Sequence, residues 1–330
     1  MTTVLVTGAA GYIGSVLTRR LLTSGFEVVG LDNLRYGGEA LLGVLGEPGF
    51  RFITCDVRNE TAVDQALEGV DAVVHFAALV GDPVCGRHPS DAVAVNVEAS
   101  KALYARCNNR GVERFIFAST CSNYGKMEGE ELVDETSELR PISLYAETKV
   151  AFERHLLEES TPGSCSPTVL RFATAYGLSP RMRFDLTVNE FTRELSLGRT
   201  LAVYGPRFWR PYCHVRDLAA AVHAVLDADE GTTAHAVFNV GLTAENYTKQ
   251  MLVDLMRRTI PDATIEYVHR DEDPRDYRVS FAKIGEVLGF QPQLTVLDGV
   301  VEIHRVVSEG FLTDVDGPRY TNTPDLTAPA

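Results

Sequence analysis

The sequence predicts an α/β protein built on a Rossmann-type, doubly wound parallel sheet, with a smaller α/β region that binds substrate. Two patterns predict this fold. Short runs of apolar, β-branched or aromatic residues alternate with helical stripes through the first 120 residues, as is typical of parallel strands buried on both faces. In addition, a glycine-rich turn separates the first strand from the first helix, which is typical of nucleotide-binding sheets.

Each element of the first half follows from its hydrophobic pattern. The expected strands are residues 4–6, 27–31, 51–54, 72–76 and 115–117. The expected helices are residues 12–23, 60–67, 91–109 and 143–159. Five strands before residue 120, with helices between them, predict one continuous parallel sheet.

Loops lengthen after about residue 175, and strand signals become short. Strands are expected over 201–204, 237–240 and 264–268, and helices over 186–197, 218–226, 248–256 and 296–307. We therefore predict a Rossmann domain over 1–175, to which about 211–240 return, and an interleaved substrate-binding region over 176–330. The polar segment from residue 313 is expected to be extended or disordered.

The composition excludes several classes of protein. The 330 residues are 45% hydrophobic and 23% charged, which is ordinary globular composition. The net charge of −14 disfavours a nucleic-acid partner. Six scattered cysteines lack metal-ligand spacing, so neither disulfides nor a metal site are expected. No stretch approaches the ~18 apolar residues of a membrane span, and the first strand leaves no room for a signal peptide, so we expect a cytoplasmic protein without a membrane partner.

The glycine-rich turn reads Gly8-Ala-Ala-Gly11-Tyr-Ile-Gly14 and opens the first helix. Glycines there permit a tight turn and let backbone N–H groups approach a pyrophosphate at the helix N-terminus. Asp32 ends the next strand, where a carboxylate accepts hydrogen bonds from the adenosine ribose and repels a 2′-phosphate. The sequence therefore favours NAD as the cofactor, while Arg35 close by leaves NADP open.

Tyr145 and Lys149 lie four residues apart in an expected helix, so their side chains share one face. A phenol has an ordinary pKa near ~10, which is too high for a base at neutral pH. A fixed ammonium and the positive nicotinamide of an oxidised cofactor would favour the phenolate, and lowering the pKa by ~3 units needs roughly 4 kcal/mol. Tyr145 is therefore the candidate acid/base.

Five motifs stand together in this chain. They are the glycine-rich turn, Asp32, the strand end His75-Phe-Ala-Ala78, the run Ser119-Thr120-Cys-Ser-Asn-Tyr-Gly125, and Tyr145-x-x-x-Lys149. Together they resemble the extended short-chain dehydrogenase/reductase family, and within it the nucleotide-sugar epimerase/dehydratase group that includes UDP-galactose 4-epimerase-like enzymes. The resemblance covers nearly the whole chain. It implies an isomerase of carbohydrate biosynthesis that takes a nucleotide-diphosphate sugar, and a homodimer formed through helices near 91–109 and 145–159.

The resemblance implies a role for each motif. Tyr145 would remove or return a sugar hydroxyl proton, Lys149 would bind the nicotinamide ribose, and Thr120 would hold the reacting oxygen. Asp56 has two interpretations, since it either caps the next helix or holds the adenine amino group. The expected cofactor wall comprises Gly8, Gly11, Tyr12, Ile13, Gly14, Asp32, Asn33, Arg35, Asp56, Val57, Phe76, Ala77, Ala78, Asn96, Ser119, Tyr145, Lys149 and Phe172.

The residues after Thr120 bear on the reaction. Dehydratases of this group commonly carry Asp-Glu there, whereas this chain has Cys121 and Ser122. We therefore favour 4-epimerisation through a transient 4-keto sugar, with a 4-ketoreductase as the alternative and a 4,6-dehydratase behind it. Cys121 itself is either an acid toward the sugar or inert packing. An idle NAD-binding protein is disfavoured because Thr120, Tyr145 and Lys149 are all present.

An acidic chain that binds a diphosphate must gather positive charge locally, and arginines are frequent in the second half. The resemblance implies that Arg210 and Arg270 hold the diphosphate, with Arg275 or Arg278 in place of the latter. Thr174 stands where many epimerases carry asparagine. The expected substrate wall comprises Thr120, Cys121, Ser122, Thr174, Asn189, Tyr204, Arg210, Arg270 and Arg275, with Tyr204 beside the base and Asn189 at a phosphate.

Overall fold

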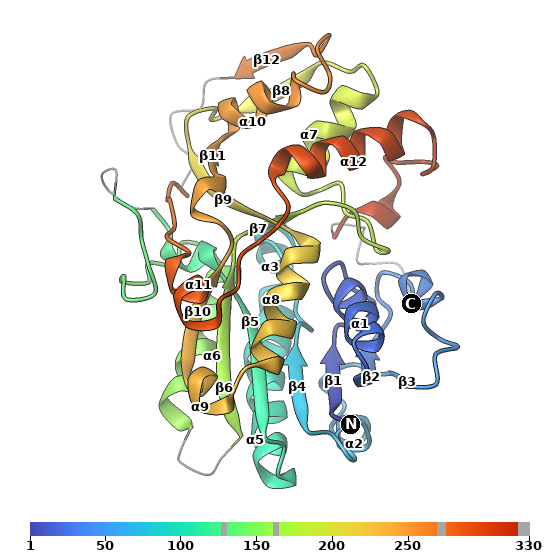
Figure 1. The fold of residues 1–330 in the computed structure, drawn as a ribbon, viewed down its shortest axis with the longest axis vertical. Helices are drawn as coiled ribbons and strands as arrows, with labels where there is room; N and C mark the ends of the chain where they lie inside the picture. The colour runs from blue at the N-terminus through green and yellow to red at the C-terminus, as the bar shows by residue number, and fades with distance from the viewer. Residues whose placement is uncertain (127–130, 161–164, 269–274, 323–330) are drawn as a thin grey trace.

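The structure, a computed structural model, describes residues 1–126, 131–160, 165–268 and 275–322. Its centre is a seven-stranded sheet in the order β10-β6-β5-β4-β1-β2-β3, in which every neighbouring pair is parallel (Figure 1). The predicted doubly wound parallel sheet is thus confirmed. The strands are β1 (Thr3–Thr7), β2 (Glu27–Asp32), β3 (Phe50–Thr54), β4 (Ala72–His75), β5 (Arg114–Thr120), β6 (Ser166–Phe172) and β10 (Ala236–Val240).

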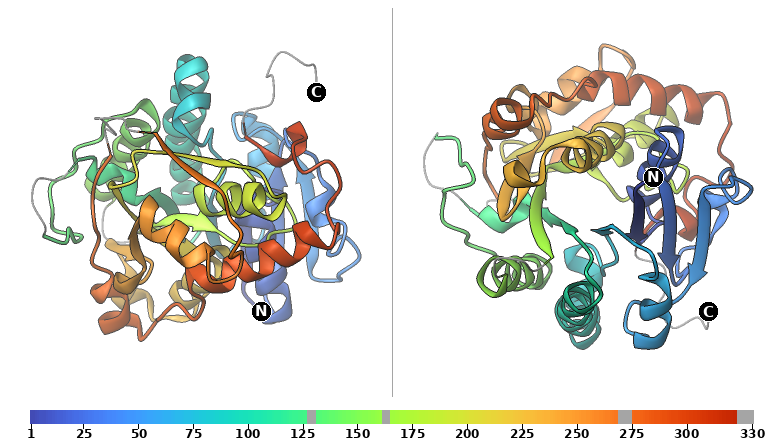
Figure 2. Two further views of the ribbon diagram at one scale, coloured as in Figure 1. Left: turned by 90° about the horizontal axis from the view of Figure 1, so that it is seen from above. Right: turned by 60° about the horizontal axis from the view of Figure 1, so that its bottom comes forward.

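Helices cover both faces of this sheet, as the two views of Figure 2 show. One face packs on α1 (Gly14–Thr23), α8 (Val215–Asp227) and α11 (Ala282–Leu288), and the other on α2 (Glu60–Ala66), α5 (Ser100–Arg110) and α6 (Leu144–Glu159). Consecutive strand residues alternate between the two layers, so Val4 and Val6 join the first core and Leu5 the second. Because both faces of the central strands are buried, apolar residues fill most positions of β1 and β4.

One predicted helix differs in form. Residues 91–109 do not make one α-helix but follow the order α4 (Pro89–Val93), a π-helical stretch (Ala94–Ala99) and α5. The wider turn carries the buried side chain of Asn96, which hydrogen-bonds to the loop after β4. The remaining short elements of this half are η1 (Glu39–Leu41), α3 (Asp82–Arg87), η3 (Cys121–Tyr124) and α9 (Glu230–Thr233).

A second region lies beyond the carboxyl ends of the sheet strands (Figure 1). It holds a three-stranded sheet, β11 (Asn246–Thr248), β9 (Trp209–His214) and β7 (Thr174–Tyr176), and the parallel pair β8 (Leu201–Tyr204) and β12 (Ile265–Val268). Around its apolar core pack α7 (Thr187–Ser196), α10 (Lys249–Met256) and α12 (Val296–Ser308), with η4 (Thr243–Glu245) leading into β11. Of residues 211–240, α8 and β10 join the large sheet and its helices, whereas β9 stays in this second region.

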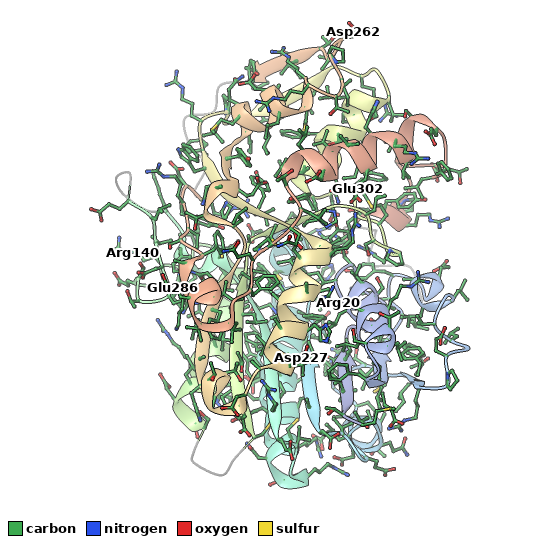
Figure 3. All side chains as sticks on the ribbon, in the orientation of Figure 1. Arg20, Arg140, Asp227, Asp262, Glu286 and Glu302 are labelled. Atoms are coloured by element: carbon green, nitrogen blue, oxygen red, sulfur yellow. The ribbon has the colours of Figure 1, made fainter. Side chains whose placement is uncertain are left out.

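Partly buried polar contacts hold α12 against the three-stranded sheet of the second region. The Glu302 carboxylate on α12 lies 2.6 Å from His214 Nε2 and accepts a hydrogen bond from the Leu178 backbone N–H at 2.7 Å. Figure 3 labels Glu302 on α12, and it shows Arg140 and Asp262 at the outline of the molecule. No helix in the described part of the chain is long and apolar enough to cross a bilayer.

Of the tail that was expected to be extended or disordered, residues 313–322 are described, and they pack against the rest of the chain. They contain the short 3₁₀ helix η5 (Pro318–Tyr320). Val315 and Tyr320 are buried in one apolar cluster with Phe184 and Ile303. Two buried apolar side chains therefore contribute to docking a stretch whose composition is otherwise polar.

Candidate active site

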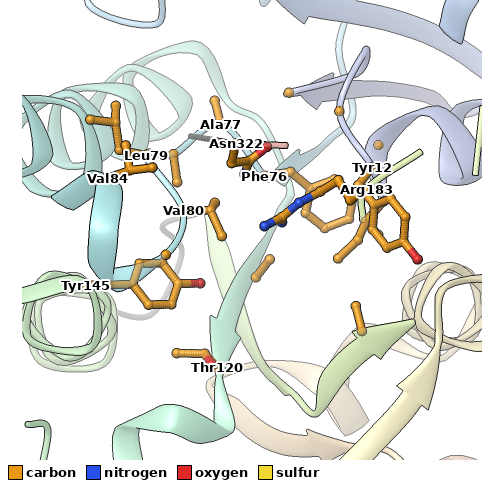
Figure 4. Close-up of a pocket in the computed structure, with 18 of the residues that line it drawn as sticks. Tyr12, Phe76, Ala77, Leu79, Val80, Val84, Thr120, Tyr145, Arg183 and Asn322 are labelled. Carbon is orange, nitrogen blue, oxygen red and sulfur yellow. The ribbon is translucent and has the colours of Figure 1, made fainter. Parts of the chain in front are cut away.

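One large cavity, of about 550 Å³, lies where β1, β2, β4 and β5 end. Figure 4 shows Tyr145, Thr120 and Arg183 around part of it. The sequence-predicted site residues that line its wall are Gly8, Gly11, Tyr12, Ile13, Gly14, Asp32, Asn33, Arg35, Asp56, Val57, Phe76, Ala77, Ala78, Ser119, Thr120, Ser122, Tyr145, Lys149, Phe172, Thr174 and Arg275. A single chamber thus brings together the expected cofactor and catalytic residues.

The glycine-rich turn forms one end of the cavity. A Cβ at Gly14 would lie 2.0 Å from the Gly8 carbonyl oxygen, and Gly8 has a φ of +74° with Ala77 N only 3.0 Å from where its Cβ would be. The backbone N–H groups of Tyr12 and Ile13 donate no hydrogen bond within the described residues. Two unpaired donors before the start of α1, both on residues that line the cavity, fit a pyrophosphate.

Two carboxylates follow the next strands. Asp32 accepts hydrogen bonds from the backbone N–H groups of Ala10 (3.1 Å) and Leu34 (2.8 Å), and burial raises the pKa of its carboxyl. Asp56 is held by Arg58, which lowers the pKa of that carboxyl to about 2.

Asp56 is not the cap of the following helix. Asn59 caps α2 through its side-chain oxygen, which accepts a hydrogen bond from the Ala62 N–H. The capping interpretation is therefore wrong, because the chain turns for three more residues before α2 begins. Asp56 instead lines the cavity, and the adenine contact stays a prediction.

The catalytic candidates lie on β5 and α6. Ser143 caps the N-terminus of α6, because its hydroxyl oxygen accepts a hydrogen bond from the Ala146 N–H. Tyr145 therefore lies in the first turn of the helix. The Tyr145 hydroxyl points into the cavity, near Thr120 at the end of β5 (Figure 4). Lys149, one turn further, donates a hydrogen bond to the Ala118 carbonyl at 2.9 Å, and burial lowers the pKa of its ammonium to about 8.

The protein alone does not lower the pKa of Tyr145 as expected. Burial raises the pKa of this phenol, and the nearby Cys85 and Asp82 raise it further. The largest opposing charge comes from Arg183, not from Lys149. Lys149 is directed at a backbone carbonyl and is itself desolvated, so its positive charge does not offset the burial of the phenol.

Three predicted residues lie behind the wall rather than in it. Asn96 holds the Leu79 backbone through both of its amide atoms, at 2.8 and 3.0 Å. Asn189 accepts from the Gly177 N–H and donates to the Tyr12 hydroxyl and the Arg183 carbonyl. Both asparagines therefore position wall segments.

Cys121, the third of these residues, is also placed away from the cavity. Its side chain is only 1% exposed and donates to the Arg171 carbonyl at 3.2 Å. Burial raises the pKa of the thiol, so the structure favours packing over an acid role.

Of the residues predicted to contact the diphosphate and the base, some line the cavity and others do not. Arg275 lines the cavity and pairs with Asp82 at 3.1 Å. Arg210 does not line it, because its guanidinium donates to the Trp209 and Arg275 carbonyls and packs over the Tyr277 ring. Tyr204 is 45% exposed on β8, outside the cavity wall. Arg270 lies outside the described residues.

The loop before α7 supplies wall residues that were not among the predicted contacts. Arg181, Arg183 and Asp185 all line the cavity. Arg183 points into it (Figure 4) and donates two hydrogen bonds to Asp185, at 2.9 and 2.8 Å. The two arginines, two residues apart in a basic stretch, were the available sequence signal. The direction in which these two side chains point depends on the conformation of the loop, and hydrophobic periodicity does not predict the conformation of a loop.

Comparison with known proteins agrees with this geometry. Residues 4–241 match the model of the NAD dependent epimerase/dehydratase family. The chain is 32% identical over 314 residues to a dTDP-glucose 4,6-dehydratase of Streptomyces griseus (91% of this chain, 92% of that one) and 28% identical over 330 residues to a UDP-glucose 4-epimerase of Streptomyces lividans (93% and 97%). The structure of the Thermus thermophilus UDP-glucose 4-epimerase complex with NAD has a TM-score of 0.81 at 27% identity, covering 94% of this chain and 100% of that one.

The fold and the cavity thus define an NAD-dependent enzyme of the extended short-chain dehydrogenase/reductase type. The chain belongs to the NAD dependent epimerase/dehydratase family. The predicted family and the predicted cofactor are both confirmed.

Proposed function

We propose that this protein is a nucleotide-sugar 4-epimerase that works through a transient 4-keto sugar, with Tyr145 as acid/base. The observation that carries the proposal is a single chamber with the glycine-rich turn at one end and the Tyr145 hydroxyl, beside Thr120, in its wall. A dinucleotide anchored at that turn and a sugar at Tyr145 would share one enclosed space.

The residues present fit NAD. The unpaired N–H groups of Tyr12 and Ile13 would hold its pyrophosphate, Asp32 its adenosine ribose, and Lys149 its second ribose. When bound, NAD takes up a hydride from a sugar carbon and can give it back.

Proton transfer falls to Tyr145. The phenolate oxygen takes the proton of the sugar C4 hydroxyl as the C4 ketone forms. After the keto sugar has rotated to present its other face, the phenol returns that proton to the C4 oxygen. Thr120 lies beside it and would hold the reacting oxygen. Because burial raises the pKa of Tyr145, ionisation needs positive charge near its oxygen, and among the described residues the charge of Arg183 opposes that rise.

The proposed substrate is a nucleotide-diphosphate sugar. Arg183 and Arg275 both line the cavity and can present guanidinium groups to its phosphates. Each is paired with a carboxylate in the protein, Arg183 with Asp185 and Arg275 with Asp82, so substrate binding would exchange one anionic partner for another.

A 4,6-dehydratase is the second candidate, since a relative 32% identical carries that name. Against it, neither of the two residues directly after Thr120 carries a carboxyl group. Cys121 is buried, and Ser122 lines the cavity. Loss of water across C5 and C6 needs an acid and a base at that carbon pair, and a serine hydroxyl does not supply them at neutral pH.

The test is to incubate the protein and NAD with UDP-, TDP-, GDP- and CDP-sugars and to identify products by NMR. We expect the 4-epimer of one substrate, without added reductant and without net change in NAD. Turnover only in a parallel reaction with added NADPH, which is consumed stoichiometrically, would establish the ketoreductase, and a 4-keto-6-deoxy sugar would establish the dehydratase. Either result would overturn the proposal.

Two further properties are proposed with this function. We infer a cytoplasmic homodimer whose interface includes α5 and α6. Sedimentation equilibrium would give twice the chain mass of 36.2 kDa, and a monomer at micromolar concentration would contradict the dimer.

A further inference from the structure

The last described segment of the chain, residues 313–322, reaches back across both regions to the cofactor end of the cavity. We propose that this C-terminal strap encloses bound NAD and slows its release. The proposal rests on the proposed function in one respect: an epimerase uses the same NAD molecule in both half-reactions, so slow release suits its chemistry.

The strap is anchored at its middle by apolar packing. Tyr320 is buried, with its ring 5.5 Å from that of Phe184 in an edge-on arrangement. The Phe184 N–H donates to the Tyr320 carbonyl at 2.7 Å. Further out, Asp316 pairs with Arg199 at 2.6 Å. Because Phe184 lies between Arg181 and Asp185, this anchor ties the strap to the loop that carries wall residues.

The end of the strap enters the cavity wall. Asn322 is 6% exposed and lines the cavity (Figure 4). Its N–H donates to Asp185 at 3.0 Å, and its carbonyl accepts from the Tyr36 hydroxyl at 3.4 Å. The Thr321 carbonyl accepts from Arg181 at 3.0 Å. The strap therefore connects the loop after β2, where Tyr36 lies, to the loop before α7.

The position along the cavity identifies the part of NAD that is enclosed. Tyr36 follows Asp32, the expected ribose ligand, by four residues. The Arg181 guanidinium lies 4.5 Å from the Tyr36 ring centre, and its charge opposes the rise that burial causes in the pKa of Asp32. The Nε of Arg181 is buried and has no hydrogen-bond partner in the described chain. These groups gather at the adenosine end, so that end would be covered by the strap.

The end of the strap is held less firmly than its anchor at Tyr320, which favours local opening of that end. Its contacts with Tyr36, Arg181 and Asp185 are single hydrogen bonds, each of modest strength. A segment held in this way can undock while the sheet stays folded. NAD would then leave only from the undocked form, and the rate of release would depend on how often the strap opens.

The direct test compares two shortened chains, each loaded with NAD. One ends at Leu312 and lacks the strap, and the matched control ends at Asn322 and keeps it. Free NAD is trapped with excess alcohol dehydrogenase and ethanol, and its release is followed by NADH absorbance, with no sugar present. We expect release to be about tenfold faster without the strap, as for the loss of two or three hydrogen bonds.

A point variant of the full chain keeps the test valid if the shorter chain does not fold. Tyr320→Ala removes the anchoring ring but no residue of the cavity wall, and it is expected to speed release severalfold. Equal release rates in folded variant and control, or a control that binds no NAD, would overturn the strap. Because no sugar is used, a chain that fails to epimerise can still show the strap, and an epimerase can still lack it.

Linkage provides a second readout. If the docked strap favours bound NAD, bound NAD must favour the docked strap by the same free energy. Arg319 is an exposed tryptic site directly before Tyr320. We expect NAD to slow cleavage after Arg319 in the full chain, detected by mass spectrometry, and cleavage that is unchanged by saturating NAD would contradict the proposal.

Discussion

The two ends of the cavity are built differently. At the cofactor end, the wall is made by strand ends and by the glycine-rich turn, where a Cβ at Gly14 would lie 2.0 Å from a backbone oxygen. At the end proposed for the substrate, the wall includes long side chains from loops, such as Arg275, which is held by the Asp82 carboxylate. A site made of backbone tolerates almost no added volume, whereas a site made of paired side chains can change partners. The cofactor is therefore expected to be the fixed element and the sugar nucleotide the adjustable one.

The largest effect is expected between the two ends, at Tyr145. Tyr145→Phe keeps the ring but removes the hydroxyl that faces the cavity. Turnover should fall by a factor on the order of 10³ to 10⁴, since loss of a general acid/base costs about that much. NAD affinity, measured by calorimetry, should stay near the wild-type value because the glycine-rich turn is untouched. Turnover within tenfold of wild type would remove Tyr145 from the mechanism.

The second effect is a pH dependence of the free energy of unfolding, caused by a buried histidine at the cofactor end. His75, at the end of β4, is fully buried between Thr7 and Ser100, and burial lowers its pKa to about 3. The unfolded chain binds this proton near pH ~6.5 and the folded chain only near 3, so the free energy of unfolding falls as the pH is lowered through that window.

Between pH ~6.5 and ~4 the His75 contribution amounts to about 3 kcal/mol, at about 1.36 kcal/mol per pH unit. Urea unfolding at several pH values would measure it, with His75→Gln as the reference that lacks the titrating group. Parallel pH curves for the two proteins would show that His75 contributes nothing.

The third effect concerns the glycine-rich turn itself. Gly14→Ala places a methyl group against the Gly8 carbonyl, and relieving that overlap must shift the turn. NAD affinity should fall roughly 10- to 100-fold, as for an overpacked site. Gly86→Ala on α3 is the matched control, because a Cβ there would meet no atom within 4 Å. If both variants bind NAD equally well, the turn is not the pyrophosphate site.

The smallest effect is expected at the substrate end. Arg275→Ala should raise the KM for the nucleotide sugar roughly tenfold, since it removes the charged hydrogen bond that we propose Arg275 makes to the diphosphate. Arg278→Ala is the control, because that guanidinium packs over the Trp209 ring and does not line the cavity. Steady-state kinetics of the two variants would show which arginine contacts the diphosphate. A larger KM change for Arg278→Ala would assign that contact to Arg278.

Sequence patterns alone were sufficient for the sheet, the cofactor and the residues at the strand ends. Parallel strands end on one edge, so Gly8, Asp32 and Thr120 had to come near one another once the strands were recognised. The four-residue spacing of Tyr145 and Lys149 likewise follows from the helix itself. These inferences hold because backbone periodicity determines the position of each residue.

Only the tertiary structure decided which long side chains reach the cavity. Arg210, on the central strand β9 of the three-stranded sheet, turns to backbone carbonyls, whereas Arg183, in the loop before α7, points into the cavity. The strap is a similar case, since Tyr320 and Asn322 meet Phe184 and Tyr36 across more than a hundred residues of chain. A loop has no helical or strand periodicity from which the direction of its side chains could be predicted. Those side chains take the orientation that burial and the nearest unpaired partner allow.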